Sequence, residues 1–455
     1  ETKDQKVTYL SRSNWNETYP TKPVSLKCTD ERMVYDMQYA HVPEANENDT
    51  MPLMETITSE FGELNLAMIK DLPFNDPMWE DLLNQLSWNE MNYLCTYGYL
   101  FLAGAVSVGA PGARAQDGPL GIRAANANLD NTYMGFPSAI IMAQTWDTDL
   151  INKLGEAFAH EIMHVGYQLI YATGINLHRN PYCGRNAEYY SEDSFISSMM
   201  SSYEIKGLKS KGIIVCAKHF ALNEQEKNRR AVSTFANEQT IREIYLKPFE
   251  IAIKKGGANG LMASFNKVGA NWAGSNDAMI NGVIRGEFGF KGTVITDWSD
   301  GGSADMDIHS GLRGGLNTQL NPNYPTTGSY GKVDFSDPVE VNLARESAKS
   351  IIYTSCSTYY TAKHNTNSDD FSVVITGPKA QVMGFEWWIL VLTIAEVVIF
   401  AALGLWIFMV FRKPKPQIET INNDVSSLTR EEKETKIKAI NAELEALNSK
   451  INELK

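Results

Sequence analysis

Four segments of the chain share one hydrophobic and polar pattern, an apolar run typical of a buried strand that ends in polar or charged side chains. They lie at residues 174–180, 212–220, 261–266 and 292–298. Segments with helical periodicity alternate with them, at roughly 148–171, 191–210, 237–256 and 275–288. Strand–helix units of about 35–45 residues are typical of a (β/α) barrel. A doubly wound open sheet has the same local pattern, so periodicity leaves both open. No glycine-rich phosphate-binding loop opens any of these helices, which weakens a nucleotide-binding interpretation.

The polar ends of these runs carry the candidate chemistry. Lys218 and His219 close one apolar run, and Asp297 and Trp298 close another. The carboxyl ends of parallel strands meet at one edge of a sheet, which is where α/β enzymes hold their catalytic groups. Further charged side chains lie in loops, namely Asp117, Arg123, Arg179 and Arg185. Charged groups bind sugar hydroxyls, an indole stacks on a pyranose ring, and a carboxylate kept ionised by nearby cations can attack an anomeric carbon.

A long apolar segment follows the strand–helix units. Residues 387–411 contain a single charge, Glu396, and about 20 apolar residues are enough to cross a bilayer. Trp387 lies at the start of the segment, and basic residues follow it directly from Arg412. We therefore expect a single membrane span at 386–411, with the preceding domain outside a bacterial cell membrane and the C-terminus in the cytoplasm.

Composition narrows the class of protein further. The 455 residues carry a net charge of −13, which argues against a nucleic-acid partner. The five cysteines are far apart and odd in number, so they support neither a disulfide framework nor a zinc ribbon. We expect no cofactor and no metal.

One short motif points to a different chemistry. His160-Glu161-Ile162-Met163-His164 matches H-E-x-x-H, the zinc-binding helix of metalloproteases. The apolar stripe of the surrounding helix comprises Leu154, Phe158, Ile162, Val165 and Leu169. His160 and His164 fall on the opposite, polar face, where they face water rather than a metal-binding cavity. A zinc metalloprotease is therefore the weaker alternative.

Six motifs in order along the chain resemble glycoside hydrolase family 3, the β-glucosidase group. They are D-G-P-L-G-I-R (117–123), F-P-S-A (136–139), N-P-Y-C-G-R-N-A-E-Y-Y-S-E-D (180–193), K-H-F-A-L-N-E-Q-E-K-N-R (218–229), R-E-I-Y-L-K-P-F (242–249) and V-I-T-D-W (294–298). The resemblance covers residues 80–320 and implies a (β/α)8-like barrel, a TIM-type α/β fold.

The resemblance also implies roles for particular residues. Asp297 would be the catalytic nucleophile of a retaining enzyme, and Trp298 would line the subsite of the sugar that is cleaved. Its hydroxyls would be bound by Asp117, Arg185, Lys218 and His219. Two departures from the family pattern stand out: Phe265 replaces a tyrosine whose hydroxyl commonly supports the nucleophile, and residues 311–320 match the last strand poorly.

The acid/base residue is not identified. In most of the family it is a glutamate on an α/β-sandwich domain that follows the barrel, and no such domain fits after residue 336. Residues 7–20 resemble the end of that sandwich, as in members with the reversed domain order, so we expect a chain that lacks the start of the protein. Within the chain, Glu224 and Glu226 are the weaker candidates.

The expected organisation has five parts. They are the end of a sandwich domain with a linker (1–70), the barrel catalytic domain (77–360), a juxtamembrane linker (361–385), the transmembrane helix (386–411) and a cytoplasmic tail (412–455). Apolar residues at alternating spacings of 3 and 4 within 430–455 are compatible with a coiled coil that joins copies of the chain, and equally with a solvated amphipathic helix.

The expected activity is that of a membrane-tethered, exo-acting β-glycosidase, above all a β-glucosidase, acting on an oligosaccharide or β-glucoside. The competing hypothesis is a catalytically impaired barrel retained for carbohydrate binding or envelope structure, motivated by Phe265 and the divergent last strand. The identity of the sugar (glucose, xylose or N-acetylglucosamine) and the linkage stay open.

Overall fold

The structure is a computed structural model that divides into two compact units, Glu1–Lys379 and Ala380–Lys455. The residues that it describes are 49–123, 133–179, 183–230, 232–299, 306–321, 331–358, 394–396, 398–404 and 427–453. The expected sandwich remnant at 7–20 and the expected linker at 361–385 lie outside these residues.

The first unit alternates strands and helices. Its strands are β1 (Phe101–Leu102), β2 (Ala113–Asp117), β3 (Leu169–Tyr171), β4 (Ile214–Phe220), β5 (Ser233–Thr234), β6 (Gly260–Ala263), β7 (Lys267–Val268), β8 (Asn271–Trp272), β9 (Thr293–Trp298) and β10 (Thr318–Leu320). Its α-helices are α3 (Leu66–Ile69), α4 (Met78–Asn84), α5 (Trp88–Thr96), α6 (Ala139–Gln144), α7 (Thr148–His164), α8 (Ser194–Ser210), α9 (Glu238–Thr240), α10 (Lys247–Ile251), α11 (Ile308–Gly314) and α12 (Pro338–Ser355). Shorter or wider helical turns are η1 (Val106–Val108), η2 (Asn186–Glu188), η3 (Ile241–Tyr245), η4 (Ala252–Gly256), η5 (Ala273–Ser275) and η6 (Ala278–Glu287).

Seven strands form one curled sheet in the order β1-β2-β3-β4-β6-β9-β10. Within this sheet the β1–β2 pair is antiparallel. The described strands β2, β3, β4, β6, β9 and β10 run parallel to their neighbours. Just before β1, the Gly98 backbone N donates to Gln319 O in β10 at 2.7 Å. The two ends of the sheet are therefore close together, and the carboxyl ends of β2, β4 and β9 lie on the same edge.

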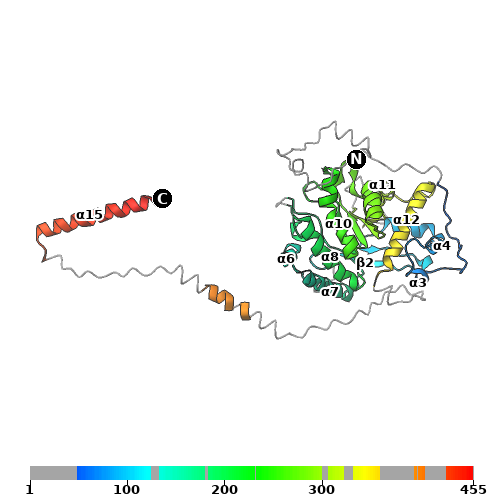
Figure 1. Ribbon diagram of the computed structural model, residues 1–455, viewed down its shortest axis with the longest axis horizontal. Helices are drawn as coiled ribbons and strands as arrows, with labels where there is room; N and C mark the ends of the chain where they lie inside the picture. Colours follow the sequence, from blue (N-terminus) through cyan, green and yellow to red (C-terminus); the bar gives the residue numbers. More distant parts are fainter. Residues whose placement is uncertain are drawn as a thin grey trace, which may run out of the picture. The chain divides into compact units, whose positions relative to one another are not determined.

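Alternate residues of the parallel strands point into two separate apolar clusters. Ile170, Val215 and Leu261 pack with α6, α7 and α8, whereas Ile214 and Met262 pack with α4, α5 and α12. Figure 1 shows α7, α8 and α10 side by side, with α12 on the opposite side next to α3 and α4. Strands covered on both faces need apolar residues at nearly every position, which explains why their sequences are continuous apolar runs rather than alternating ones.

Short polar side chains and glycine define the helix ends and the closest helix contact. Asp147 accepts hydrogen bonds from the first backbone N–H groups of α7, and Asp193 does the same for α8. Helices α7 and α8 cross so closely that a Cβ atom on Gly207 would lie 2.2 Å from Asn152 O. Any larger residue at position 207 would have to separate the two helices.

The structure confirms most of the predicted elements and corrects several. The described part of the apolar run, 174–179, contains no strand, only an isolated bridge from Gly174 to Lys218. The strand lies upstream at β3, within the segment predicted as the end of a helix. All three residues of β3 are buried, so its composition does not distinguish it from the last turn of an apolar helix. Helices α4 and α5 are separate, and Ser87 and Glu90 form a capping box that begins α5. The poorly matched segment 311–320 does contain a strand, β10, parallel to β9.

The second unit contains helix α15 (Arg430–Glu453). The Thr429 backbone N donates to Glu432 Oε2 at 2.9 Å, which is one half of a capping box. Ile437, Ile440 and Leu444 are exposed on this helix. Residues 394–396 and 398–404 are helical, and most of the predicted span 386–411 lies outside the described residues. Within the described part of the chain, no helix combines the length and apolar character that crossing a bilayer requires.

Candidate active site

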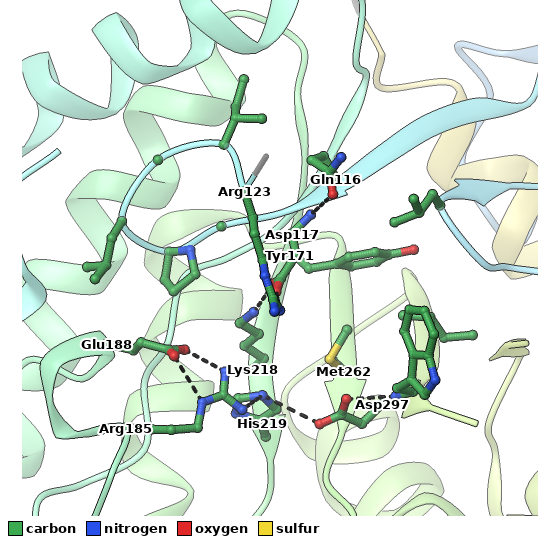
Figure 2. Close-up of a pocket in the computed structure, with 18 of the residues that line it drawn as sticks. Gln116, Asp117, Arg123, Tyr171, Arg185, Glu188, Lys218, His219, Met262 and Asp297 are labelled. Carbon is green, nitrogen blue, oxygen red and sulfur yellow. Dashed lines mark hydrogen bonds and ion pairs between the residues drawn. The ribbon is translucent and has the colours of Figure 1, made fainter. Parts of the chain in front are cut away.

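A polar cavity of about 1090 Å³ opens at the carboxyl edge of the curled sheet. Figure 2 shows charged side chains converging on it from β2, β4, β9 and the segments that follow β2 and β3. All six residues predicted for the sugar site line this cavity. Five of them come from four different segments of the chain: Asp117, Arg185, Lys218, His219 and Asp297. Trp298, the sixth, also lines the cavity, and its ring contacts Tyr99 edge-on at 5.0 Å.

Asp117, at the end of β2, is held between two cations. Its Oδ1 accepts a very short hydrogen bond from Lys218 Nζ, and its Oδ2 lies 3.2 Å from Arg123 Nη1. Burial by itself would raise the pKa of Asp117, but the ion pair with Lys218 and the bond from Arg123 lower it below its usual value. The following Gly118 has φ +152, and a Cβ there would collide with Gly121 O. This glycine turn directs the chain back across the cavity.

His219 is neutral and fixed in orientation. Arg185 Nη1 donates to His219 Nε2 at 2.7 Å, so the ring proton is on Nδ1, which faces the Tyr189 hydroxyl at 3.2 Å. Burial, followed by the charges of Arg185 and Lys218, lowers the pKa of His219 well below its usual value. Asn176 holds the backbone of His219 on both sides: its Oδ1 accepts from His219 N at 2.7 Å, and its Nδ2 donates to His219 O at 3.0 Å.

Arg185 belongs to the loop after β3 and is itself held by a carboxylate. Its Nε donates to Glu188 Oε1 at 3.1 Å and its Nη2 to Glu188 Oε2 at 2.5 Å, a two-point pairing that fixes the guanidinium plane. The same guanidinium reaches His219 with its third nitrogen. Glu188 thereby orients the contact between Arg185 and His219.

Asp297 has one oxygen bonded and one open. Its Oδ1 accepts from the Trp298 backbone N at 2.7 Å, whereas Oδ2 has no hydrogen-bond partner among the described residues and lies 3.6 Å from His219 Nε2. Burial raises the pKa of Asp297, opposed by the positive charges of Arg229, Arg185 and Lys218. Because His219 is neutral, these three cations rather than the imidazole favour the ionised carboxylate.

The remaining candidates divide between this cavity and a second one. Glu226 lines the first cavity, where it accepts from Arg229 Nη1 at 2.9 Å and from Asn223 Nδ2 at 3.1 Å. Glu224 and Arg179 line a separate cavity of about 260 Å³ instead. Burial raises the pKa of Glu224 to about 7. The expectation that Arg179 joins the site is therefore wrong, because its guanidinium lies over Tyr245, 5.5 Å from the ring centroid.

The H-E-x-x-H motif is on α7, away from the cavity. His160 and His164 are exposed on the polar face of this helix, as its periodicity predicts. Among the described residues, no group of histidines, cysteines and carboxylates is arranged to hold a metal ion.

Sequence reasoning did not assign roles to Glu188, Tyr189 and Arg229. All three lie inside segments whose motifs were recognised, 180–193 and 218–229. Glu188 is three residues after Arg185, and Arg229 is three residues after Glu226. An arginine and a glutamate three residues apart predict a local ion pair. This spacing does not predict that the pair lies beside His219 and Asp297.

A cavity lined by several charged side chains at the carboxyl edge of a parallel sheet is where α/β proteins usually bind their ligands. Comparison with known proteins narrows this class. Residues 124–334 match the sequence model described as "Glycosyl hydrolase family 3 N terminal domain". The chain is 40% identical over 204 residues to β-glucosidase B of Emericella nidulans, which covers 45% of this chain and 24% of the relative.

Two further relatives also match over part of their length. An exo-α-(1→6)-L-arabinopyranosidase of Bifidobacterium breve is 36% identical over 231 residues, which cover 49% of this chain and 30% of the relative. The solved structure of β-glucosidase 3B from Thermotoga neapolitana in complex with glucose matches with a TM-score of 0.55 and 29% identity, over 63% of this chain and 43% of that one. Residues 124–334 are thus similar to glycoside hydrolase family 3, and the chain is similar to β-glucosidases. The chain spans less than half the length of each of these relatives.

Proposed function

We propose that the chain carries the sugar-binding and nucleophilic part of a retaining β-glycosidase, and that its substrate is a terminal, non-reducing β-D-glucosyl residue. The observation that carries the proposal is the open Oδ2 of Asp297. This buried carboxylate oxygen has no hydrogen-bond partner in the described part of the chain, and Asp297 lines a cavity of about 1090 Å³. The β-glucosidase relatives support glucose as the sugar. The arabinopyranosidase relative makes a pentopyranose the second candidate.

In the first chemical step, Asp297 Oδ2 attacks the anomeric carbon. A C–O bond forms to Asp297, the glycosidic C–O bond breaks, and the departing oxygen keeps that electron pair. Asp117, Lys218 and Arg185 would hold the hydroxyls of the sugar, and Trp298 would lie against its ring. A water molecule then attacks the same carbon from the face that the leaving group vacated. Its C–O bond forms as the bond to Asp297 breaks, Asp297 leaves as a carboxylate, and the acid/base residue takes a proton from the water.

The departing oxygen of an ordinary glycoside requires a proton, which a second carboxyl group at about 5–5.5 Å supplies in retaining enzymes. In the described part of the chain, the other carboxylates of the cavity are occupied by cations. Asp117 pairs with Lys218, Glu188 with Arg185 and Glu226 with Arg229. We therefore place the acid/base on a segment outside the described residues.

Covalent trapping tests this function without requiring the acid/base residue. In a 2,4-dinitrophenyl 2-deoxy-2-fluoro-β-glucoside, the phenolate leaves without a proton, and the fluorine slows hydrolysis of the glycosyl-enzyme. We expect mass spectrometry to find one 2-fluoroglucosyl group per chain, on the peptide that contains Asp297. A chain that binds glucose but stays unlabelled would favour the alternative function, a carbohydrate-binding or envelope-structural protein, which the departure at Phe265 motivates.

We extend the proposal to the architecture and the location of the protein. The hydrogen bond from Gly98 to Gln319 supports a (β/α)8-like barrel over 77–360. The apolar composition of 386–411 supports a single-pass membrane tether, with the barrel outside and residues 412–455 inside. Alkaline extraction of membranes from cells that make the chain should leave it in the pellet, whereas deletion of 386–411 should release it. Release of the intact chain would overturn the tether.

We also propose that α15 joins copies of the chain through a coiled coil. Its exposed apolar residues are spaced 3, 4, 3 and 4 apart: Ile437, Ile440, Leu444, Leu447 and Ile451. A partner helix would remove these apolar side chains from water and so stabilise the pair. Sedimentation of a peptide of residues 427–455 should give a multiple of the monomer mass, and a monomer would contradict the proposal.

A further inference from the structure

Two guanidinium groups lie over the ring of Phe265. Phe265 follows β6 and is 3% exposed. The Cζ atom of Arg229 lies 4.5 Å from its ring centroid, and the Cζ atom of Arg230 lies 4.9 Å from it. A cation over an aromatic face is attracted by the negative charge of the π system. The ring therefore restricts where both guanidinium groups can lie.

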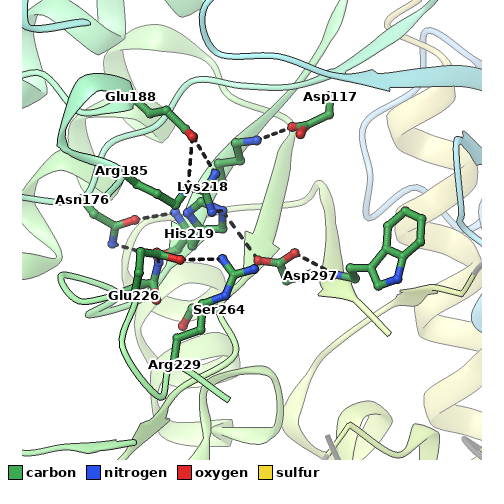
Figure 3. A network of polar contacts seen from close by, with 12 residues as sticks. Asp117, Asn176, Arg185, Glu188, Lys218, His219, Glu226, Arg229, Ser264 and Asp297 are labelled. Carbon is green, nitrogen blue, oxygen red and sulfur yellow. Dashed lines mark hydrogen bonds and ion pairs between the residues drawn. The ribbon is translucent and has the colours of Figure 1, made fainter. Parts of the chain in front are cut away.

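Arg229 is also held from a second direction. Its Nη1 lies 2.9 Å from Glu226 Oε2, and Asn223 Nδ2 donates to the other Glu226 oxygen at 3.1 Å. Figure 3 shows the Arg229 guanidinium bonded to Glu226 and directed toward the Asp297 carboxyl. One ring face and one carboxylate thus fix the position of a positive charge near the candidate nucleophile.

The charges that face Asp297 come from three segments. Lys218 is on β4, Arg185 is in the loop after β3, and Arg229 is in the loop at 221–230. The neutral His219, also on β4, lies 3.6 Å from Asp297 and adds no charge. The thiol of Cys216, also on β4, has a pKa raised mainly by burial and is therefore uncharged. Among the three cations that oppose the effect of burial on the pKa of Asp297, Arg229 contributes most.

We propose that Phe265 is a positioning residue for the candidate active site: its ring holds Arg229 between Glu226 and Asp297, so that the guanidinium charge stays beside the nucleophile. The inference rests on the proposed function, because it assigns Phe265 a role in the attack by Asp297. It accounts for an apolar residue next to the most polar part of the sheet edge. It also assigns the support of the nucleophile to a guanidinium rather than to a side-chain hydroxyl at position 265.

The test compares Phe265→Leu, Arg229→Met and the double variant. Leucine keeps an apolar side chain but removes the aromatic face. Loss of the nearby positive charge disfavours the carboxylate, so the acidic limb of the rate of Asp297 labelling should move to higher pH, by about 0.5–1 unit. Labelling on that limb should be about 3- to 10-fold slower. Because both changes remove one interaction, the double variant should shift no further than Arg229→Met alone.

Two controls separate positioning from simple loss of packing. Phe249→Leu removes a fully buried ring that packs on Phe220 in the same apolar cluster, so it should lower thermal stability without moving the acidic limb. Arg230→Met tests which guanidinium matters, and it should leave the limb in place. The inference would be overturned by an unchanged acidic limb in Phe265→Leu or by additive shifts in the double variant. In either case, labelling of Asp297 would leave the proposed function intact.

A crystal structure of Phe265→Leu gives a readout that requires no catalysis. We expect the Arg229 guanidinium to leave its position beside Asp297. An Arg229 side chain that stays in place would refute the positioning role, whether or not the wild-type chain is labelled. Absence of labelling in the wild-type chain would count against the proposed function alone.

Discussion

Asp297→Asn is expected to lower kcat/KM for aryl β-glucosides by at least about 10³-fold, because the amide cannot form the glycosyl ester that the proposed mechanism requires. Asparagine keeps the shape of the side chain and its hydrogen bond from Trp298 N, which joins Oδ1 at 2.7 Å. The measurement is steady-state hydrolysis of 4-nitrophenyl β-glucoside by the full-length protein. With Asp297→Ala, added azide should restore turnover and give the α-glucosyl azide, since the small anion can occupy the place of the carboxylate.

The same substitution should make the fold more stable at neutral pH. The pKa of Asp297 is raised in the folded chain, mainly by burial. The folded state therefore binds more protons than the unfolded state between the two pKa values, and stability falls as pH rises through this range. Asparagine removes that loss, so the unfolding midpoint of Asp297→Asn should exceed that of the wild type at pH 7 but not well below the usual pKa of aspartate.

His160→Ala is the control for the alternative chemistry. His160 is exposed on α7, so its removal should leave both hydrolysis and stability unchanged. If His160→Ala abolished activity and Asp297→Asn did not, the metalloprotease hypothesis would replace the glycosidase.

Lys218→Met is expected to have the second largest effect, on both binding and stability. Lys218 is 2% exposed, and its ammonium bonds Asp117 at the base of the cavity. Removing it leaves a mostly buried carboxylate with Arg123 as its remaining ion-pair partner, which should cost roughly 3 kcal/mol of unfolding free energy. Loss of a charged hydrogen bond to the sugar should lower kcat/KM by about 10- to 100-fold. Urea denaturation and steady-state kinetics measure the two effects.

The pH dependence of this destabilisation has a defined sign. Because the pKa of Asp117 is lowered in the folded chain, its ion pair stabilises the fold at neutral pH, and this contribution is lost as pH falls through the folded pKa. The difference in stability between wild type and Lys218→Met should therefore shrink on acidification.

Lys349→Met is the matched control. Lys349 is 9% exposed and pairs with Glu80 at 2.8 Å, an ion pair between α12 and α4 rather than in the cavity. It should lower stability but leave kcat/KM unchanged. Equal losses of activity in the two lysine variants would mean that Lys218 acts only through the stability of the fold.

Much of the fold and of the site could be predicted from local pattern. The apolar runs that became β4, β6 and β9 were located within a few residues, because strands buried on both faces have few polar positions. Lys218, His219 and Asp297 were placed at one edge because parallel strands end together. The same rule failed for β3, whose three residues have no polar end and follow a helix with little interruption.

Which charges meet was not predictable in this way. Arg179 and Arg185 are similar residues in the same stretch of chain, yet Arg185 reaches His219 and Arg179 lies over Tyr245 in another cavity. The two outcomes depend on the loop after β3, where Glu188 holds one guanidinium in the site. Composition and spacing contain no information about such a choice.

The sequence by itself determined that this is a parallel α/β chain with its chemistry at the strand ends, and it identified the residues of the candidate sugar site. The first conclusion follows from periodicity and side-chain chemistry, which are local properties. The roles of the site residues were implied by the resemblance of six motifs to glycoside hydrolase family 3. Only the tertiary structure decided that Asp297 keeps one oxygen open, that His219 is neutral, and that Phe265 packs against Arg229. These depend on burial and on contacts between residues distant in the chain, because desolvation and neighbouring charge set protonation.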